Sequence, residues 1–170
     1  MKKLLGIVLL GGYALIVGVS GVQAQRSPVL TPGESLLRHD AQVEILFSTK
    51  SAPLRLNVEV ADETPEQDRG LMGRRLAGDN EGMFFVYTTA KPRIFWMRGT
   101  PMPLDMLFFD SDRRLVALVS NAEPFSDRLI KSGVPAKYVL ELPAGFADRH
   151  SVGLGAQFQI VEGSSAGNDR

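Results

Sequence analysis

The sequence predicts a mainly β domain, a compact sandwich or partly open barrel of short strands with two short helices. Residues 54–60 alternate apolar and polar side chains at every step, which is the period of a half-buried strand. After Gly82 the chain continues in short apolar runs bounded by Gly, Pro, Asp or Asn, as strands joined by turns do. Strands do not alternate with long helices, so neither a dinucleotide-binding nor a P-loop architecture is indicated.

The strands are expected throughout the domain. Residues 43–47 form a weaker candidate strand before the alternating segment. Leu104 to Phe109 and Leu115 to Val119 are apolar on both faces, which predicts that both strands lie centrally under a second layer. Asp110-Ser111-Asp112 between them is typical of a hairpin turn. The predicted strands after residue 60 cover residues 83–87, 94–97, 104–109, 115–120, 138–142 and 157–161.

A short helix is predicted to begin at Thr64. The threonine can cap the helix, Pro65 suits its first position, and Gln67 stands where a capping box requires it. The helix should end near Met72, because Gly73 can adopt the left-handed conformation of a C-terminal cap. A second helical segment of one or two turns is expected within residues 144–150.

The first 24 residues have the pattern of a secretory signal peptide. Lys2 and Lys3 form a positive start, Leu4 to Val19 an uncharged apolar run, and Val22-Gln23-Ala24 a small-residue cleavage site. We therefore expect an exported protein, periplasmic or secreted. The alternative is an uncleaved membrane anchor, for which the apolar run is somewhat short. The predicted organisation is a signal peptide over 1–24, a linker over 25–40, one domain over 41–161 and a flexible tail over 162–170.

Composition and charge argue against several kinds of partner and site. The chain has 19 basic and 19 acidic residues, and removal of Lys2 and Lys3 leaves 17 basic residues and a net charge of −2. Because binding to nucleic acid needs a basic surface, no nucleic-acid partner is expected. The absence of cysteine excludes disulfides, thiolate nucleophiles and thiolate metal sites. With only two histidines, His39 and His150, no metal or other cofactor is expected.

Five short strings are more distinctive than the strand pattern: Arg69-Gly70-Leu71-Met72, Glu81-Gly82-Met83-Phe84-Phe85, Phe95-Trp96-Met97, Pro103-Leu104-Asp105-Met106 and Tyr138-Val139-Leu140-Glu141. Their order and spacing resemble the family called domain of unknown function 192. The resemblance covers roughly residues 54–160. It implies a compact β-rich fold, often found behind a signal peptide, and it supplies no established catalytic activity to carry over to this chain.

The chain departs from the family pattern in three places. Arg98-Gly99-Thr100 stands where the family usually has Lys-Asn-Thr, so a side-chain amide is missing at Gly99. Pro143 precedes Ala144-Gly145 where Asn-Ala-Gly is usual, and Gly155-Ala156 replaces a common Gly-Asp pair. If the missing groups serve a shared ligand, this chain binds that ligand differently.

Two carboxylates on apolar strands are candidate ligand-binding residues. A carboxylate at Asp105, in a strand apolar on both faces, needs hydrogen-bond donors or a proton. It either accepts backbone N–H groups from a neighbouring turn or acts as an acid, a base or a ligand contact. Glu141 forms either an ion pair with a nearby Arg or Lys or an acid–base pair with Asp105, as in glycoside hydrolysis.

Four further residues complete the candidate site, namely Arg69, Trp96, Arg98 and Thr100. Trp96, with Arg98 at its rim, forms either a stacking platform for a sugar or aromatic ligand or part of the core. Arg69 either binds an anionic group or stands near the helix C-terminus because the helix dipole favours a cation there. Trp96, Arg98 and Thr100 also lie within ten residues of Asp105 in the sequence.

Three functions are compatible with these candidates. The first is a non-enzymatic envelope domain that binds an unknown small molecule, glycan or partner protein. The second is a polysaccharide-directed hydrolase or lyase that uses Asp105 and Glu141. The third is a purely structural accessory module. Binding is favoured over catalysis because the candidate cluster contains no nucleophile–base pair, and membrane contact is expected only through an uncleaved signal segment.

Overall fold

Seven strands and two short helices make up the part of the chain that a computed structural model describes, residues 42–48 and 53–161. The predicted signal peptide, linker and tail, and His39, lie outside these residues. No helix within them is long and apolar enough to span a membrane. The elements are β1 (Gln42–Ser48), β2 (Leu54–Ala61), α1 (Thr64–Arg69), β3 (Glu81–Phe95), β4 (Leu104–Phe109), β5 (Leu115–Ala122), β6 (Ile130–Pro143), α2 (Phe146–Arg149) and β7 (Gln157–Val161).

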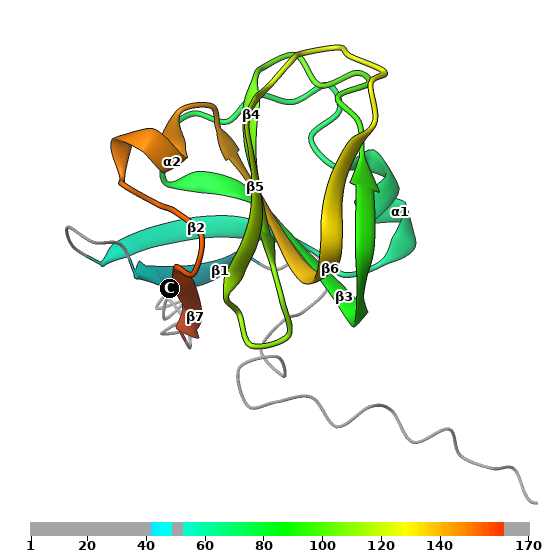
Figure 1. The fold of residues 1–170 in the computed structure, drawn as a ribbon. Coiled ribbons are helices and arrows are strands. Elements are labelled where there is room, and N and C mark those ends of the chain that lie inside the picture. The colour runs from blue at the N-terminus through cyan, green and yellow to red at the C-terminus, as the bar shows by residue number, and fades with distance from the viewer. Residues whose placement is uncertain (1–41, 49–52, 162–170) are drawn as a thin grey trace, which may run out of the picture.

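The strands form one strongly curved sheet in the order β5-β4-β6-β3-β2-β1-β7 (Figure 1). β2 and β3 pair in parallel, whereas the other neighbours pair antiparallel. The two edges of the sheet meet at a bridge between Arg114 and Gln157, where Leu115 N–H donates to the Ala156 carbonyl at 2.8 Å. The mainly β prediction is confirmed, and of its two forms the open, curled sheet matches the partly open barrel.

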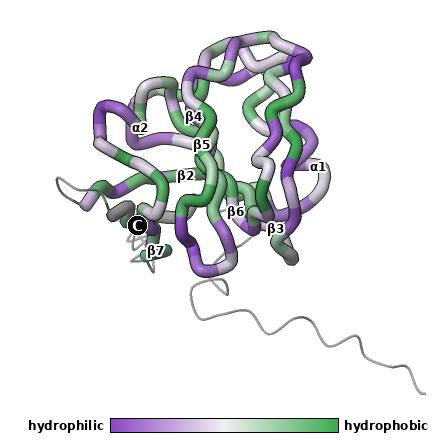
Figure 2. Tube along the Cα trace, viewed as in Figure 1, coloured by the Kyte–Doolittle hydropathy of each residue, from purple (hydrophilic) through white to green (hydrophobic). Residues whose placement is uncertain are grey.

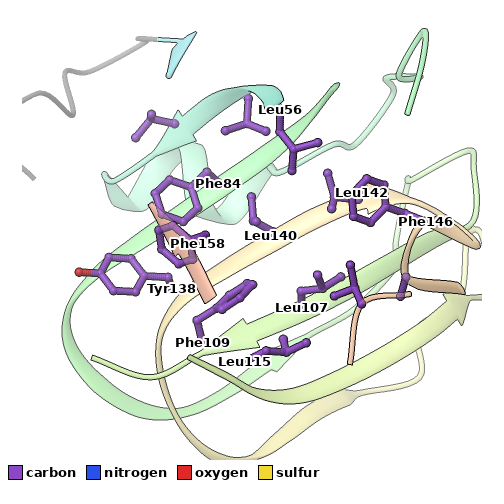
Figure 3. Packing of buried hydrophobic residues seen from close by; sticks show 14 residues of the cluster. Leu56, Phe84, Leu107, Phe109, Leu115, Tyr138, Leu140, Leu142, Phe146 and Phe158 are labelled. Carbon is purple, nitrogen blue, oxygen red and sulfur yellow. The ribbon is translucent and has the colours of Figure 1, made fainter. Parts of the chain in front are cut away.

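The central strands bury side chains on both faces of the sheet and so separate two hydrophobic clusters. Leu107 and Phe109 of β4 belong to the first cluster, in which aromatic rings from β3, β4, β6 and β7 pack together (Figure 3). Met106 and Phe108, which alternate with them, belong to the second cluster. Figure 2 shows the matching pattern, with apolar residues along the strands and polar ones at the turn between β4 and β5.

The prediction of two central strands holds for β4 but is wrong for β5. All six residues of β4 are buried between β5 and β6. β5 is instead an edge strand, and Val116 to Val119 are only half-buried. The same sequence pattern, apolar side chains on both faces, therefore corresponds to full burial in β4 and to partial burial in β5.

Two strands are longer than the sequence predicts. β3 joins the predicted strand 83–87 to the first two residues of the predicted strand 94–97. The register to β6 shifts in the irregular stretch between Val86 and Lys91. Trp96 and Met97 follow the end of the strand, so this part of the prediction is wrong. β6 begins at Ile130, eight residues before the predicted start at Tyr138. Gly133, Pro135 and Pro92 hide this pairing in the sequence, because such residues usually mark turns.

The helix α1 begins where predicted but is capped differently. Glu63 is the N-cap residue, and the Glu66 carboxylate accepts the backbone N–H groups of Asp62 and Glu63 at 3.1 and 3.2 Å. Gln67, predicted for that role, instead donates to the carbonyls of Ala61 and Val86 at 3.2 and 3.0 Å. These two bonds hold α1 beside β2 and β3. The second predicted helical segment is confirmed as α2.

The C-terminal end of α1 also differs from the prediction. The helix stops at Arg69 rather than near Met72, and its cap is Gly70 rather than Gly73. Gly70 has a φ of 48° and its N–H donates to the Glu66 carbonyl at 2.8 Å. The chain therefore turns earlier than predicted, directly against the sheet.

Candidate functional site

An open cleft of about 400 Å³ lies between the end of α1 and strand β3. Residues 67–72, at the end of α1 and in the following turn, form one side. Side chains of β3 form the other side, and Glu141 of β6 lies among the lining residues. Figure 1 shows α1 beside β3 and β6, on the side of the sheet away from α2. The lining includes four of the six candidate residues: Arg69, Trp96, Thr100 and Glu141.

Glu141 is the buried acidic group of the cleft. Its residue is 5% exposed. Among the residues that the structure describes, no group makes a hydrogen bond or an ion pair with its carboxyl, so the predicted ion pair with an Arg or Lys is absent there. Burial raises the pKa of Glu141 to about 8, because desolvation penalises the charged form. The carboxyl group is therefore mostly protonated at neutral pH and can donate a hydrogen bond into the cleft.

Gly70 lets the end of α1 pass close to this carboxyl group. A Cβ atom on Gly70 would lie 3.5 Å from Phe85 Cζ and 3.9 Å from Glu141 Oε2. A larger side chain there would cover the carboxyl group, and the positive φ also disfavours any residue with a Cβ. The Arg69-Gly70 string thus places an arginine at the cleft and keeps Glu141 uncovered.

Asp105 belongs to the opposite face of the sheet and does not line the cleft. It is fully buried. Its Oδ1 accepts the backbone N–H groups of Asn121 and Gly145 at 2.9 and 3.1 Å, and its Oδ2 accepts that of Ala147 at 2.9 Å. The carboxylate therefore ties β4 to the end of β5 and to the start of α2.

Trp96 is a surface residue, so its interpretation as part of the core is wrong. It is 43% exposed and lines the cleft. Arg98 lies outside the cleft, where its guanidinium stands 4.9 Å from the centre of the Trp96 ring and its Nε donates to Asp127 at 2.6 Å. This arrangement orients the indole while leaving part of it accessible to a ligand.

Tyr87 and Arg93 of β3 line the cleft and were missed by sequence reasoning. Tyr87 follows Phe85 by two residues, so strand alternation puts both on one face and would have identified it. Arg93 lies beyond the irregular stretch of β3, where that alternation cannot be extended. Its guanidinium carbon stands 3.6 Å from the centre of the Tyr87 ring, and its Nε donates to the Ala136 carbonyl at 3.0 Å.

Gly99, where the family usually has Asn, is part of a turn beside the cleft. Its φ is 68°, a region that Gly and Asn adopt more readily than other residues. Its carbonyl accepts the Gly73 N–H at 2.8 Å, and a Cβ atom at this position would contact the Met72 side chain. The backbone conformation at this position is therefore one that both Gly and Asn can adopt.

Within residues 42–48 and 53–161, no group of three or more His, Asp or Glu side chains is arranged to hold a metal ion. The chemistry offered by the cleft is accordingly that of aromatic faces, two guanidinium groups, hydroxyl groups and one buried carboxyl group. These groups suit the recognition of a small ligand by stacking and hydrogen bonding.

Several solved structures share this fold, among them the following two. A proposed transcription regulator from Sinorhizobium meliloti is 35% identical with a TM-score of 0.69, over 73% of this chain and 97% of that one. A protein of unknown function from Novosphingobium aromaticivorans is 29% identical with a TM-score of 0.68, over 78% and 99%. The model of the family DUF192, described as "Uncharacterized ACR", matches residues 45–160. No curated protein matches the chain significantly.

Proposed function

This chain belongs to the domain of unknown function 192 family, and from that membership and the cleft we propose that it is an exported envelope domain that binds a small molecule or a glycan unit. The observation that carries the proposal is the convergence of Arg69, Trp96 and Glu141, from three separate parts of the chain, on one cleft. A volume of about 400 Å³ lies within the usual range of small-molecule sites, about 300–1,000 Å³.

Binding is a better account of this site than hydrolysis by two carboxylates. Acid–base cleavage of a glycosidic bond requires both carboxyl groups to flank one substrate. Asp105 and Glu141 face opposite sides of the sheet, and Asp105 is occupied by three backbone donors. Regulation of transcription, the proposed role of the Sinorhizobium relative, finds no support in the charge of this chain, which has equal numbers of basic and acidic residues.

The test is a screen of sugars, peptidoglycan fragments and organic acids by thermal shift, followed by calorimetric titration of the hits. We expect at least one hit whose affinity falls roughly tenfold or more in Trp96→Ala, because loss of a stacking face weakens binding. Phe125→Ala is the matched control, since Phe125 is an aromatic residue 63% exposed that does not line the cleft. A complete screen without a hit, or hits equally affected by both variants, would contradict the proposal.

Export is tested separately, by cell fractionation and N-terminal sequencing of the mature protein. We expect the protein outside the cytoplasm with a new N-terminus at Gln25, following Ala24. A mature protein that retains Met1 in the membrane fraction would support the uncleaved anchor instead, and cytoplasmic protein would contradict export.

A further inference from the structure

Two arginines face the cleft without forming an ion pair among the described residues. Arg69 is exposed at the end of α1, and Arg93 projects from β3 on the other side. Among the described residues, neither guanidinium forms an ion pair with a carboxylate. Arg93 donates instead to the backbone carbonyls of Ala136 and Thr89, which fix its orientation but leave its charge uncompensated.

The acidic groups of the cleft do not cancel these two charges. Asp68 is exposed to solvent on α1, and Glu141 is the other carboxyl group in the lining. Burial raises the pKa of Glu141 to about 8, so it contributes little negative charge at neutral pH. Burial also lowers the pKa of Arg93 from its ordinary value, since desolvation penalises its charge, and a bound anion would offset that penalty. The lining therefore carries two guanidinium charges against the single exposed carboxylate of Asp68.

The other groups that line the cleft indicate which further features a ligand would have. The Tyr87 hydroxyl and the Glu141 carboxyl make no hydrogen bond to another described residue, so both are available to a ligand. Trp96 lines the same cleft with part of its indole exposed. A fitting ligand thus combines a flat or ring-shaped body with polar substituents and a negative charge.

We propose that the cleft binds a small organic anion, in which a carboxylate or phosphate is held by Arg69 and Arg93 and the attached ring stacks on Trp96. The Glu141 carboxyl and the Tyr87 hydroxyl donate hydrogen bonds to polar substituents of the same molecule. This inference rests on the proposed function, since it names the chemical class of the small molecule bound at that site.

The experiment compares anionic ligands with uncharged analogues that carry the same kind of ring. Glucuronate is titrated against glucose, and benzoate and phenyl phosphate against benzamide, with NMR chemical shifts of the full-length mature protein as the readout. We expect one anion to bind roughly tenfold or more tightly than its neutral partner, as expected for a charge-assisted hydrogen bond to a guanidinium. Comparing the sugar ligands with the aromatic ligands shows which kind of ring the cleft prefers. Comparing benzoate with phenyl phosphate shows whether it prefers a carboxylate or a phosphate.

Arg69→Gln should clearly reduce the preference for the anion, since only Arg93 then holds it, and should leave the weaker binding of the neutral partner unchanged. The control is Arg75→Gln, which removes an exposed arginine that does not line the cleft and should retain the preference. Neutral partners that bind in the cleft as tightly as the anions would overturn the anion inference alone. If no titration changes the chemical shifts of the protein, the inference of an anion site is overturned. The proposed function is overturned only if the wider ligand screen also gives no hit.

Discussion

Asp105 and Glu141 lie on neighbouring strands but face opposite sides of the same sheet. Asp105 pairs with Leu142 and Glu141 pairs with Met106 in the antiparallel register of β4 and β6. Because side chains alternate along a strand, Asp105 lies on the face of the first hydrophobic cluster and Glu141 on the face of the second. Asp105 accepts three backbone hydrogen bonds, whereas Glu141 lines an open cleft. Substitutions of Asp105 and of Glu141 are therefore expected to have different effects.

Asp105→Asn should destabilise the fold. Either orientation of an amide would point an NH₂ group at backbone N–H donors that now meet a carboxylate oxygen. Leaving a buried donor unpaired costs about 1–3 kcal/mol, so we expect the free energy of unfolding to fall by about 2 kcal/mol in urea denaturation.

Asp110→Asn is the control for this substitution. Asp110 also accepts two backbone N–H groups, those of Asp112 and Arg114, but in an exposed turn where Asn is well tolerated. The free energy of unfolding of Asp110→Asn should be close to that of the wild type. An Asp105→Asn protein with unchanged stability and lost ligand binding would contradict the structural role of Asp105.

Glu141→Gln should change how stability depends on pH. The pKa of Glu141 is about 8 in the folded protein against 4.5 for the ordinary side chain, so the folded state holds its proton more tightly. Below pH 4.5 both states are protonated and the effect is absent. Between pH 4.5 and 8 the unfolded state ionises first, so wild-type stability declines, and above pH 8 the loss is complete.

The size of this loss is at most about 5 kcal/mol, since one pKa unit corresponds to about 1.4 kcal/mol. Asp68, Arg69, Tyr87 and Arg93 also line the cleft and are the same in both proteins. Urea denaturation across the pH range should therefore show that the free energy of unfolding of Glu141→Gln increases relative to that of the wild type as pH rises. Glu123→Gln, in an exposed position outside this cleft, should follow the wild type. Parallel profiles for wild type and Glu141→Gln would rule out the buried, proton-binding carboxyl group.

Gly82→Ala should be strongly destabilising. A Cβ atom at Gly82 would lie 2.5 Å from the backbone carbonyl oxygen of Glu141 and 2.7 Å from Leu142 Cδ2. Because the backbone of β6 cannot yield without disturbing its pairing with β3, we expect a loss of about 2 kcal/mol or more, measured as a lower midpoint of thermal unfolding. Gly153→Ala, where a Cβ has open space, should be nearly neutral. Equal midpoints for the two variants would contradict the close approach of β3 and β6.

Gln67→Leu should loosen α1 from the sheet. The variant loses both hydrogen bonds from the side-chain amide to the carbonyls of Ala61 and Val86, each worth about 1 kcal/mol. We expect lower stability and faster amide exchange in α1, measured by hydrogen–deuterium exchange. Gln159→Leu, an exposed change in β7, serves as the control. Unchanged exchange in α1 would show that other contacts hold the helix.

Local patterns predicted the elements whose contacts are local. The alternation of residues 54–60 identified β2, the two-sided apolar run identified β4 as a central strand, and Pro65 marked the start of α1. β6 before Tyr138 escaped detection because its pairing with β3 is held by long-range hydrogen bonds across residues that usually form turns. The edge position of β5 was missed for a related reason, since strand order is not a property of a strand's own sequence.

By itself, the sequence determined the mainly β class, the family and four of the residues that line the cleft, because repeated short motifs and strand periodicity are written into consecutive residues. Only the tertiary structure decided which candidates share a site. Trp96 is at the surface, Arg98 turns toward Asp127, and Tyr87 and Arg93 join the cleft. It also separated Asp105 from Glu141, because the register between β4 and β6 determines which face of the sheet each carboxyl group occupies.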